Sequence, residues 1–122
     1  MQEMEGLGVG TDIEDVGRFK DLDRNRNRNF LDKIFTKKEL DYIFSRGKPN
    51  QHLAARYAGK EAVVKALVSL GKKGVDYKNI EILNDINGAP EVNYNDTKLK
   101  IYVSLSHSND RALAFAVIIK NE

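Results

Sequence analysis

The residues best suited to chemistry in this chain are a carboxylate and an ammonium that fall among apolar residues. Glu61 and Lys65 lie four positions apart in a segment whose apolar residues recur at helical spacing. At about 100° per residue they share a stripe with Ala54, Ala58 and Val68. Two interpretations are open: an i,i+4 ion pair at the edge of a core, or a cleft above the alanines into which both charges point.

A second carboxylate, Asp12, ends a short segment in which glycine alternates with Leu7 and Val9. As a structural residue it would be an acid in the first turn of a helix, where the macrodipole favours it. As a functional residue it would be a hard oxygen ligand beside Glu61. Two carboxylates are too few for an all-protein calcium cage. They suit a magnesium ion that takes its other ligands from water and phosphate oxygens.

Arg56 and Lys60 are like charges four positions apart on the same predicted helix, an arrangement that destabilises a bare helix. It is better explained if an anion lies between them. His107 follows Ser104 and Ser106 at the end of a predicted strand. It is either a satisfied structural group or one of a dense set of hydrogen-bond donors at this turn.

Arginine alternates with asparagine over residues 24–29, where Arg24, Arg26 and Arg28 stand. Such a tract is usually a solvated segment. The alternative is a docking surface for an acidic partner or for a phosphate backbone, as in a small RNA- or ribosome-binding module. That module would leave Glu61 unexplained, and aromatic residues for base stacking are sparse near the tract.

Several familiar motifs are absent from the sequence. The glycines at 6, 8 and 10 do not fit the dinucleotide-binding spacing, because Thr11 stands where its last glycine would fall. There is no phosphate-binding P-loop motif and no G-x-S-x-G nucleophile elbow. The absence of cysteine excludes a disulfide framework, a thiolate zinc site and a cysteine nucleophile.

Length and composition predict one cytoplasmic domain. A chain of 122 residues matches a single domain that buries about two-thirds of its unfolded surface. No apolar run approaches the ~20 residues of a membrane span, and the acidic first five residues are unlike a signal peptide. Lysine plus arginine number 20 and aspartate plus glutamate 18, which argues against a nucleic-acid coat protein. The acidic excess lies in residues 1–17, so a basic surface can exist elsewhere.

The pattern predicts an α+β fold with helices packed on a mainly antiparallel sheet. After a short strand at 6–10, a capping box of Thr11 and Glu14 is expected to open a helix. A second capping box, at residues 36–39, opens another. The strongest helical pattern runs over residues 52–70 and ends before Gly71.

Short strands are expected after this helix. Ile80, Ile82 and Ile86 would share one face, and a turn at 87–90 would lead towards Val92. Alternating apolar residues predict a strand at 101–105. The unbroken apolar run 112–119 predicts a central strand covered on both faces.

Taken together, these segments resemble the holo-(acyl-carrier-protein) synthases, the small 4′-phosphopantetheinyl transferases. The middle segment, with the pattern R-x-x-x-K-E-A-x-x-K-A, is the specific one. Similarity extends from about residue 6 to 119, as a single domain over 1–122 in which residues 1–5 are a flexible extension. The similar segments are Gly8-Val-Gly-Thr-Asp-Ile13, Phe35-Thr-Lys-Lys-Glu-Leu40, Leu53-Ala-Ala-Arg-Tyr-Ala-Gly-Lys-Glu-Ala-Val-Val-Lys-Ala-Leu67, Asn87-Gly-Ala-Pro90 and Val103-Ser-Leu-Ser-His-Ser108.

The resemblance implies transfer of the phosphopantetheine arm of coenzyme A to a serine of apo acyl carrier protein, with release of adenosine 3′,5′-bisphosphate. It implies that Asp12 and Glu61 hold Mg²⁺ on the pyrophosphate. The metal would polarise the phosphoryl oxygens and neutralise the charge of the leaving group. Glu61, directly or through a metal-bound water, is the candidate for activating the serine hydroxyl.

The resemblance also implies a set of coenzyme A contacts. Lys60 and Lys65 would contact phosphates, Arg56 the 3′-phosphate, and His107 a phosphate from the strand end. Two further residues, Gly88 and Pro90, would lie near the adenine, contributed by a neighbouring subunit. The small members of the family are homotrimers with active sites at subunit interfaces, so a homotrimer is expected.

A basic stretch of the family binds the acidic carrier protein, and here it corresponds loosely to four arginines, Arg18, Arg24, Arg26 and Arg28. The chain departs from the family in two places. Asp15 stands where many members have glutamate, and residues 68–74 replace the usual Gly-Thr-Gly loop. Lys72 and Lys73 could supply charge in that loop.

Overall fold

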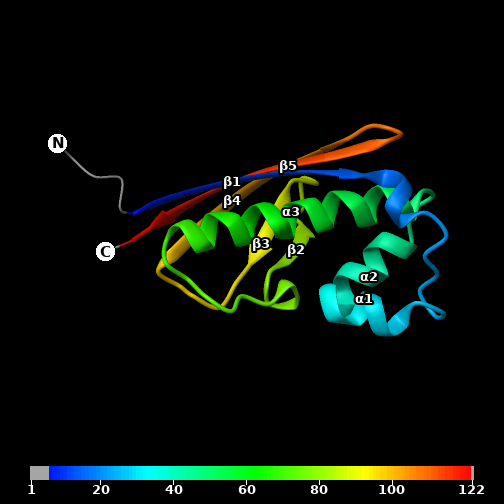
Figure 1. Cartoon of the computed structure of the whole chain (residues 1–122), viewed down its shortest axis with the longest axis horizontal. Coiled ribbons are helices and arrows are strands. Elements are labelled where there is room, and N and C mark those ends of the chain that lie inside the picture. The colour runs from blue at the N-terminus through cyan, green and yellow to red at the C-terminus, as the bar shows by residue number, and fades with distance from the viewer. Residues whose placement is uncertain (1–5, 122) are drawn as a thin grey trace.

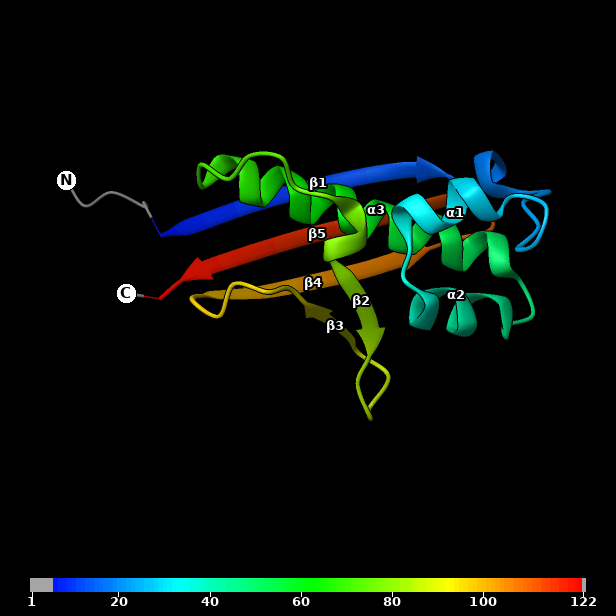
Figure 2. The same cartoon turned by 90° about the horizontal axis from the view of Figure 1, so that it is seen from below.

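One long helix lying along a three-stranded antiparallel sheet makes up the centre of the molecule (Figure 1). The computed structural model describes residues 6–121. The sheet has the order β1-β5-β4, and a separate β2–β3 hairpin projects beside it (Figure 2). The elements are β1 (Leu7–Asp15), η1 (Val16–Phe19), α1 (Arg28–Ile34), α2 (Lys37–Phe44), α3 (Pro49–Ser69), η2 (Tyr77–Asn79), β2 (Glu81–Asn84), β3 (Pro90–Asn93), β4 (Leu99–His107) and β5 (Arg111–Lys120).

Small residues let α3 approach the sheet closely. A Cβ atom at Gly10 would lie 2.0 Å from the carbonyl oxygen of Ala62, and one at Gly8 would lie 2.5 Å from that of Ala66. The inner face of β5 likewise carries mostly small side chains, and the face of α3 that packs on the sheet is rich in alanine. The buried alanines of these two elements are Ala54, Ala55, Ala58, Ala62, Ala66, Ala112, Ala114 and Ala116. The glycines on β1 are therefore needed for packing against the helix backbone.

The helix predicted to open at Thr11 is wrong. The strand β1 continues through this position to Asp15, which pairs with Arg111 at the end of β5, and only the short η1 turn follows. A nine-residue ladder with β5 satisfies the backbone groups that the local capping signal would have used in a helix. The ladder places Thr11 on the outer face and Glu14 on the inner face.

The strand β5 lies at the centre of its sheet, as predicted, but it is not covered on both faces. Its residues alternate between buried and exposed, and the exposed set is large and apolar. Neighbouring strands add to this outer face, which no element in residues 6–121 covers. Its exposed members are Val9, Ile13, Tyr102, Leu113, Phe115 and Ile119.

The remaining predicted elements differ from the structure mainly at their ends. The capping box at Thr36 is present, with the Thr36 hydroxyl accepting from the backbone N–H of Glu39. The central helix begins at Pro49, because proline suits the first helical turn, and Gly71 follows it with φ +92°. The prediction that Ile86 shares one face with Ile80 and Ile82 is wrong, since Ile86 lies in the hairpin turn and is 99% exposed whereas the other two are buried.

Candidate active site

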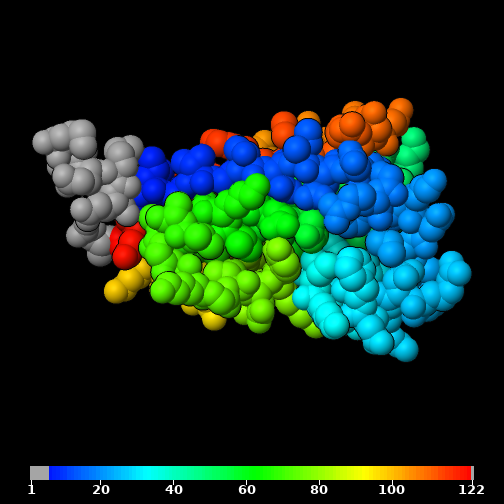
Figure 3. Space-filling view, in the orientation of Figure 1, coloured from blue at the N-terminus to red at the C-terminus, as the bar shows by residue number. Residues whose placement is uncertain are grey.

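The candidate functional carboxylates lie where β1 and α3 run side by side. Because side chains alternate along a strand, Asp12 and Glu14 face the helix on the same side as Gly8 and Gly10. In Figure 3 the blue surface of β1 lies against the green surface of α3. Beyond Gly10 the strand therefore carries two acids along the same inner face.

Lys65 reaches across from α3 to Asp12. Its ammonium donates to the carbonyl oxygen of Thr11 at 2.9 Å and lies 3.4 Å from Oδ1 of Asp12. The intrahelical ion pair with Glu61 is thus not what Lys65 makes in this structure. The lysine side chain is 57% exposed, so its ammonium is accessible to a ligand at this position.

Glu61 is held by two tyrosines. The hydroxyls of Tyr57 and Tyr77 each donate to one of its carboxylate oxygens at 3.0 Å. Burial, together with the hydrogen bond to this carboxylate, raises the pKa of both tyrosines, so they remain donors at neutral pH. The Glu61 carboxylate is fixed by one partner from its own helix and one from η2.

Glu14 is a functional candidate that the sequence analysis missed. Burial raises the pKa of its carboxyl to about 7, reinforced by the adjacent carboxylate of Asp12 and by the negative charge of Glu61, while Arg18 opposes the shift. Arg18 forms an ion pair with Glu14. Period-two spacing from Gly8 and Gly10 would have found Glu14, had the capping-box pattern not assigned it to a helix.

The carboxylates between β1 and α3 have the chemistry of a divalent-cation site. Oδ2 of Asp12 is buried and has no hydrogen-bond partner, and the charges of Asp12 and Glu61 add to the effect of burial in raising the pKa of Glu14. Carboxylate oxygens are the ligands that Mg²⁺ prefers. Among residues 6–121, no three His, Cys, Asp or Glu side chains are close enough to hold a metal together. The protein would therefore supply two carboxylates and leave the other positions to water and substrate.

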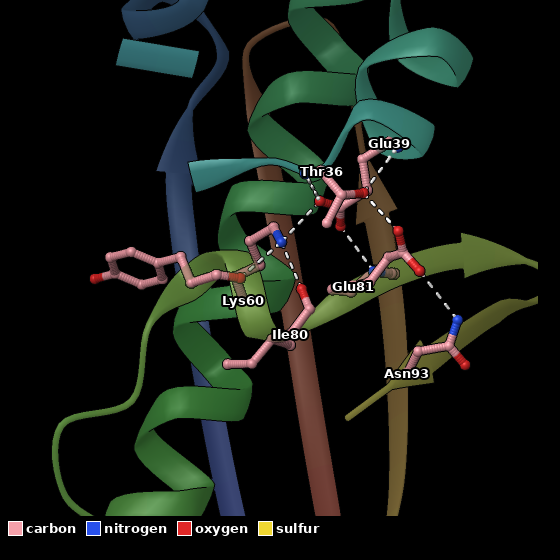
Figure 4. A network of polar contacts seen from close by, with 8 residues as sticks. Thr36, Glu39, Lys60, Ile80, Glu81 and Asn93 are labelled. Atoms are coloured by element: carbon pink, nitrogen blue, oxygen red, sulfur yellow. Dashed lines mark hydrogen bonds and ion pairs between the residues drawn. The ribbon is translucent and has the colours of Figure 1, made fainter. Parts of the chain in front are cut away.

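Lys60 is placed differently from the expectation. Its side chain is fully buried, and its ammonium lies 2.9 Å from Oε1 of Glu39 (Figure 4). It also donates to the carbonyl oxygens of Tyr77 and Ile80. The anion beside Lys60 in this structure is thus a buried carboxylate, and the ammonium has no exposed surface to offer a phosphate. Lys60 instead ties α3 to α2 and to the segment that carries Tyr77.

Arg56 belongs to a group of basic side chains around Tyr42. Its guanidinium lies 4.4 Å from the centre of the Tyr42 ring and donates to Oδ1 of Asn84. The Asn84 amide in turn donates to the carbonyl oxygen of Gly88 at 3.2 Å. The structure thereby brings together Arg56 and the turn that contains Gly88.

His107 reaches the same group through a residue that was not predicted, His52. Their rings lie 5.6 Å apart, and the His52 ring lies 5.7 Å from that of Tyr42. Arg46 covers Tyr42 with a distance of 5.1 Å from its guanidinium carbon to the ring centre. We call Arg46, His52, Arg56 and His107 the basic cluster.

Pro90 lines a separate cavity of about 290 Å³ between β3 and β4. Asp85, Tyr102 and Val103 are among the other lining residues. The cavity is next to the turn that the Asn84 amide joins to the basic cluster. A planar ligand group could pack here against the aromatic ring of Tyr102 and the aliphatic side chain of Val103.

The arginines expected to bind a partner extend from η1, which contains Arg18, to Arg28 at the start of α1. Arg24 pairs with Asp41 at 2.5 Å, while Arg18 pairs with Glu14. Arg18 also lines a cavity of about 280 Å³ together with Phe30 and Tyr57. Since Tyr57 donates to Glu61, this cavity adjoins the candidate catalytic carboxylate.

The predicted site residues fall into two groups, which are represented on α3 by Glu61 and by Arg56. Arg56 and Glu61 are five positions apart, which places them about 140° apart around the helix at 3.6 residues per turn. The first contacts α2 and β2, whereas the second contacts η2 and lies beside the β1 acids. The structure brings Asp12, Glu61 and Lys65 together and gathers Arg56, His107 and Gly88 elsewhere.

Comparison with known proteins identifies the class to which this fold and site belong. The model of the 4′-phosphopantetheinyl transferase superfamily matches residues 8–118. A relative from Thermodesulfovibrio yellowstonii, named holo-[acyl-carrier-protein] synthase, is 47% identical over 91% of this chain and 96% of its own length. The chain therefore belongs to the holo-[acyl-carrier-protein] synthase family of this superfamily.

Solved structures agree with this assignment. The holo-[acyl-carrier-protein] synthase of Neisseria meningitidis is 34% identical, with a TM-score of 0.76 over 93% of this chain and 98% of that chain. The synthase of Bacillus anthracis, solved in complex with CoA (3′,5′-ADP), is 28% identical, with a TM-score of 0.76 over 93% of this chain and 96% of that chain. These comparisons do not support the RNA-binding alternative.

Proposed function

We propose that this protein is a magnesium-dependent holo-[acyl-carrier-protein] synthase that acts in the cytoplasm and supports fatty acid biosynthesis. It would transfer 4′-phosphopantetheine from coenzyme A to a serine of apo acyl carrier protein and release adenosine 3′,5′-bisphosphate. The proposal rests on one observation in a chain of this family. Lys65 of α3 lies beside Asp12 of β1, on the part of α3 that also carries Glu61. No helix among residues 6–121 is long and apolar enough to span a membrane.

Asp12 and Glu61 are the residues that would hold Mg²⁺. Bound there, the ion would polarise the phosphoryl oxygens of the pyrophosphate and neutralise the charge of the leaving group. Lys65 is exposed and already beside Asp12, so its ammonium can contact a phosphoryl oxygen without a backbone movement. Its role is to bind and orient the phosphate that is attacked.

Glu61 is the proposed base. Tyr57 and Tyr77 occupy one hydrogen-bonding position on each carboxylate oxygen, and each oxygen keeps a further lone pair. Glu61 would accept the proton of the serine hydroxyl as that oxygen bonds to phosphorus and the pyrophosphate P–O bond breaks. Lys60 acts at a distance, because it anchors the carbonyl oxygen of Tyr77 and so helps to position the second donor.

The acidic carrier protein would dock on the surface formed by Arg18, Arg24, Arg26 and Arg28. The apolar cavity lined by Phe30 lies beside Arg18, so charge and apolar contact are available together. Because Tyr57 also lines this cavity, a serine presented there would approach Glu61. Salt should weaken this docking by screening.

The active site would be completed by a second copy of the chain in a homotrimer. The basic cluster and Glu61 lie on different faces of α3, so both are reached more readily if one comes from a neighbour. The exposed apolar face of the sheet, which includes Leu113 and Phe115, offers a surface that association would bury. On this account His107, Gly88 and Pro90 would contact a coenzyme A whose pyrophosphate is held by the Asp12 and Glu61 of another subunit.

The experiment that tests this function follows release of adenosine 3′,5′-bisphosphate by chromatography, using coenzyme A and apo acyl carrier protein. Asp12→Asn and Glu61→Gln should each lower the rate by at least about a hundred-fold, the size expected for a lost general base or charge stabiliser. Omission of Mg²⁺ should do the same. Near-normal rates in either variant would refute the roles given to these carboxylates.

A further inference from the structure

The basic cluster collects basic side chains around one half-buried tyrosine, Tyr42. Arg46 and Arg56 both cover the Tyr42 ring, and the His52 ring lies between Tyr42 and His107. Like charges so close to one another are unfavourable unless an anion compensates them. Such a cluster is the arrangement that recognises phosphate groups.

No carboxylate within residues 6–121 forms an ion pair with the cluster. The acid that influences Arg56 is Glu39, whose oxygens are already used by Lys60 and by the backbone N–H groups of Thr36 and Ile82. Nε of Arg56 is buried and has no hydrogen-bond partner. The cluster therefore has unused donors and uncompensated charge.

The pKa of His52 is affected by both burial and this charge. Partial burial and the charges of Arg56, His107 and Arg46 lower the pKa of its imidazole, so it is neutral at pH 7. Arg56 of α3, His107 of β4 and Arg46 from the turn after α2 are the charged or titratable groups that act on His52, and the Tyr42 ring of α2 packs against it. A phosphate dianion placed among these groups would make protonation of the His52 ring favourable.

We infer that His52 is a further phosphate-binding residue, and that it binds the 3′-phosphate monoester of coenzyme A, together with Arg56 and His107, by taking up a proton. The neutral imidazole gains one proton from solvent, and the imidazolium then donates to a phosphate oxygen. Because a phosphate monoester loses its second proton near pH 6, the pairing is strongest between about pH 6 and 7.5. The cluster would thus distinguish coenzyme A from dephospho-coenzyme A, with a preference that grows as pH falls towards 6.

The test is calorimetric titration of the full chain with coenzyme A and with dephospho-coenzyme A, between pH 6 and 8. At pH 7, buffers with different ionisation enthalpies report the protons taken up on binding. The unaltered protein should take up protons with coenzyme A but not with dephospho-coenzyme A. In His52→Gln, proton uptake should fall by at least half, and coenzyme A should bind about ten-fold more weakly at pH 6.5, the size of one charge-assisted hydrogen bond.

Lys33→Gln is the matched control, because it removes one exposed charge from α1, away from the cluster. Its titrations should equal those of the unaltered protein. Undiminished proton uptake in His52→Gln would overturn the inference, and so would an equal loss of affinity for both ligands.

Because this role rests on the proposed function, the two must be told apart. If the unaltered protein binds coenzyme A and transfers its arm but His52→Gln behaves identically, only the role of His52 fails. If the unaltered protein neither binds coenzyme A nor modifies the carrier, the transferase function fails.

Discussion

At the scale of single residues, Lys60 and Glu39 show which interactions stabilise a charged pair in the protein interior. Both side chains are fully buried, and removing two charges from water costs several kcal/mol per ion. They are tolerated because Glu39 also accepts from two backbone N–H groups and Lys60 donates to two carbonyl oxygens. Substituting one partner alone leaves an uncompensated charge.

Lys60→Met should therefore lower the free energy of unfolding by about 3–5 kcal/mol, the usual cost of breaking a buried pair. The double variant with Glu39→Gln should lose less than the sum of the single variants, because the orphaned charge is gone. Urea denaturation measures both. Lys33→Met, on an exposed position, should stay within about 0.5 kcal/mol of the unaltered protein. A Lys60→Met protein as stable as this control would contradict the buried pair.

Glu14 predicts a pH dependence of stability. Its folded pKa of about 7 lies above the ordinary value of 4.5, so the folded state binds the proton more tightly. This contribution is full below about pH 4.5 and is lost as pH rises through 7, up to about 3 kcal/mol. In EDTA, Glu14→Gln should remove that decline. Asp15→Asn, at the exposed neighbouring position, should retain it, and an unchanged slope in Glu14→Gln would contradict the assignment.

The individual site residues were predictable to different degrees. Asp12, Glu61 and Lys65 stand in spaced motifs, so their types and separation point to one site. His52 has no such motif, and it joins His107 only because α3 and β4 meet in space. Lys60 was assigned to a phosphate because sequence cannot reveal that Glu39, from another helix, lies beside it.

At the scale of elements, the contact between β1 and α3 sets the positions of the proposed catalytic groups. Gly10 allows the strand to meet the helix backbone, and Asp12 follows two residues later on the same face. The sequence predicts the long helix and the antiparallel strands well, because their periodicity is strong. It mispredicts the end of β1, since the capping pattern at Thr11 is local whereas pairing with β5 is not.

Gly10→Ala should destabilise the fold by about 3 kcal/mol, because the new Cβ would overlap the carbonyl oxygen of Ala62. It should also move Asp12 away from Lys65 and so reduce transfer in the protein that remains folded. Thermal unfolding and a transfer assay below the melting temperature check both effects. Gly17→Ala is the matched control, since nothing lies within 4 Å of its Cβ. Equal stability of the two variants would contradict the close contact.

At the scale of the whole molecule, the proposed homotrimer would explain both the apolar outer face of the sheet and the separation of the site into two groups of residues. Phe115 and Leu113 are about half exposed on β5, the central strand of that sheet. We propose that association buries them between copies and that the basic cluster of one chain then serves the Glu61 of another. Sequence periodicity could not foresee this surface, since the same apolar run suits a strand that is covered within one chain.

A mixture of two inactive variants tests the shared site. Glu61→Gln removes the base, and His107→Glu places a negative charge against the phosphate at an exposed position. Each variant alone should be nearly inactive, but after the two are unfolded and refolded together, about a quarter of the interfaces in the proposed homotrimer should carry both intact residues. Recovered transfer activity is the expected result. No recovery, with mixed trimers shown to form, would mean that each chain builds its site alone.

The most direct test of the central claim is the intact mass of an apo acyl carrier protein after incubation with this protein, coenzyme A and Mg²⁺. We expect the carrier to gain the mass of one phosphopantetheine group on its serine. The gain should disappear in EDTA, with Glu61→Gln, and with a carrier whose serine is replaced by alanine. An unmodified carrier, under conditions in which a known synthase modifies it fully, would contradict the claim.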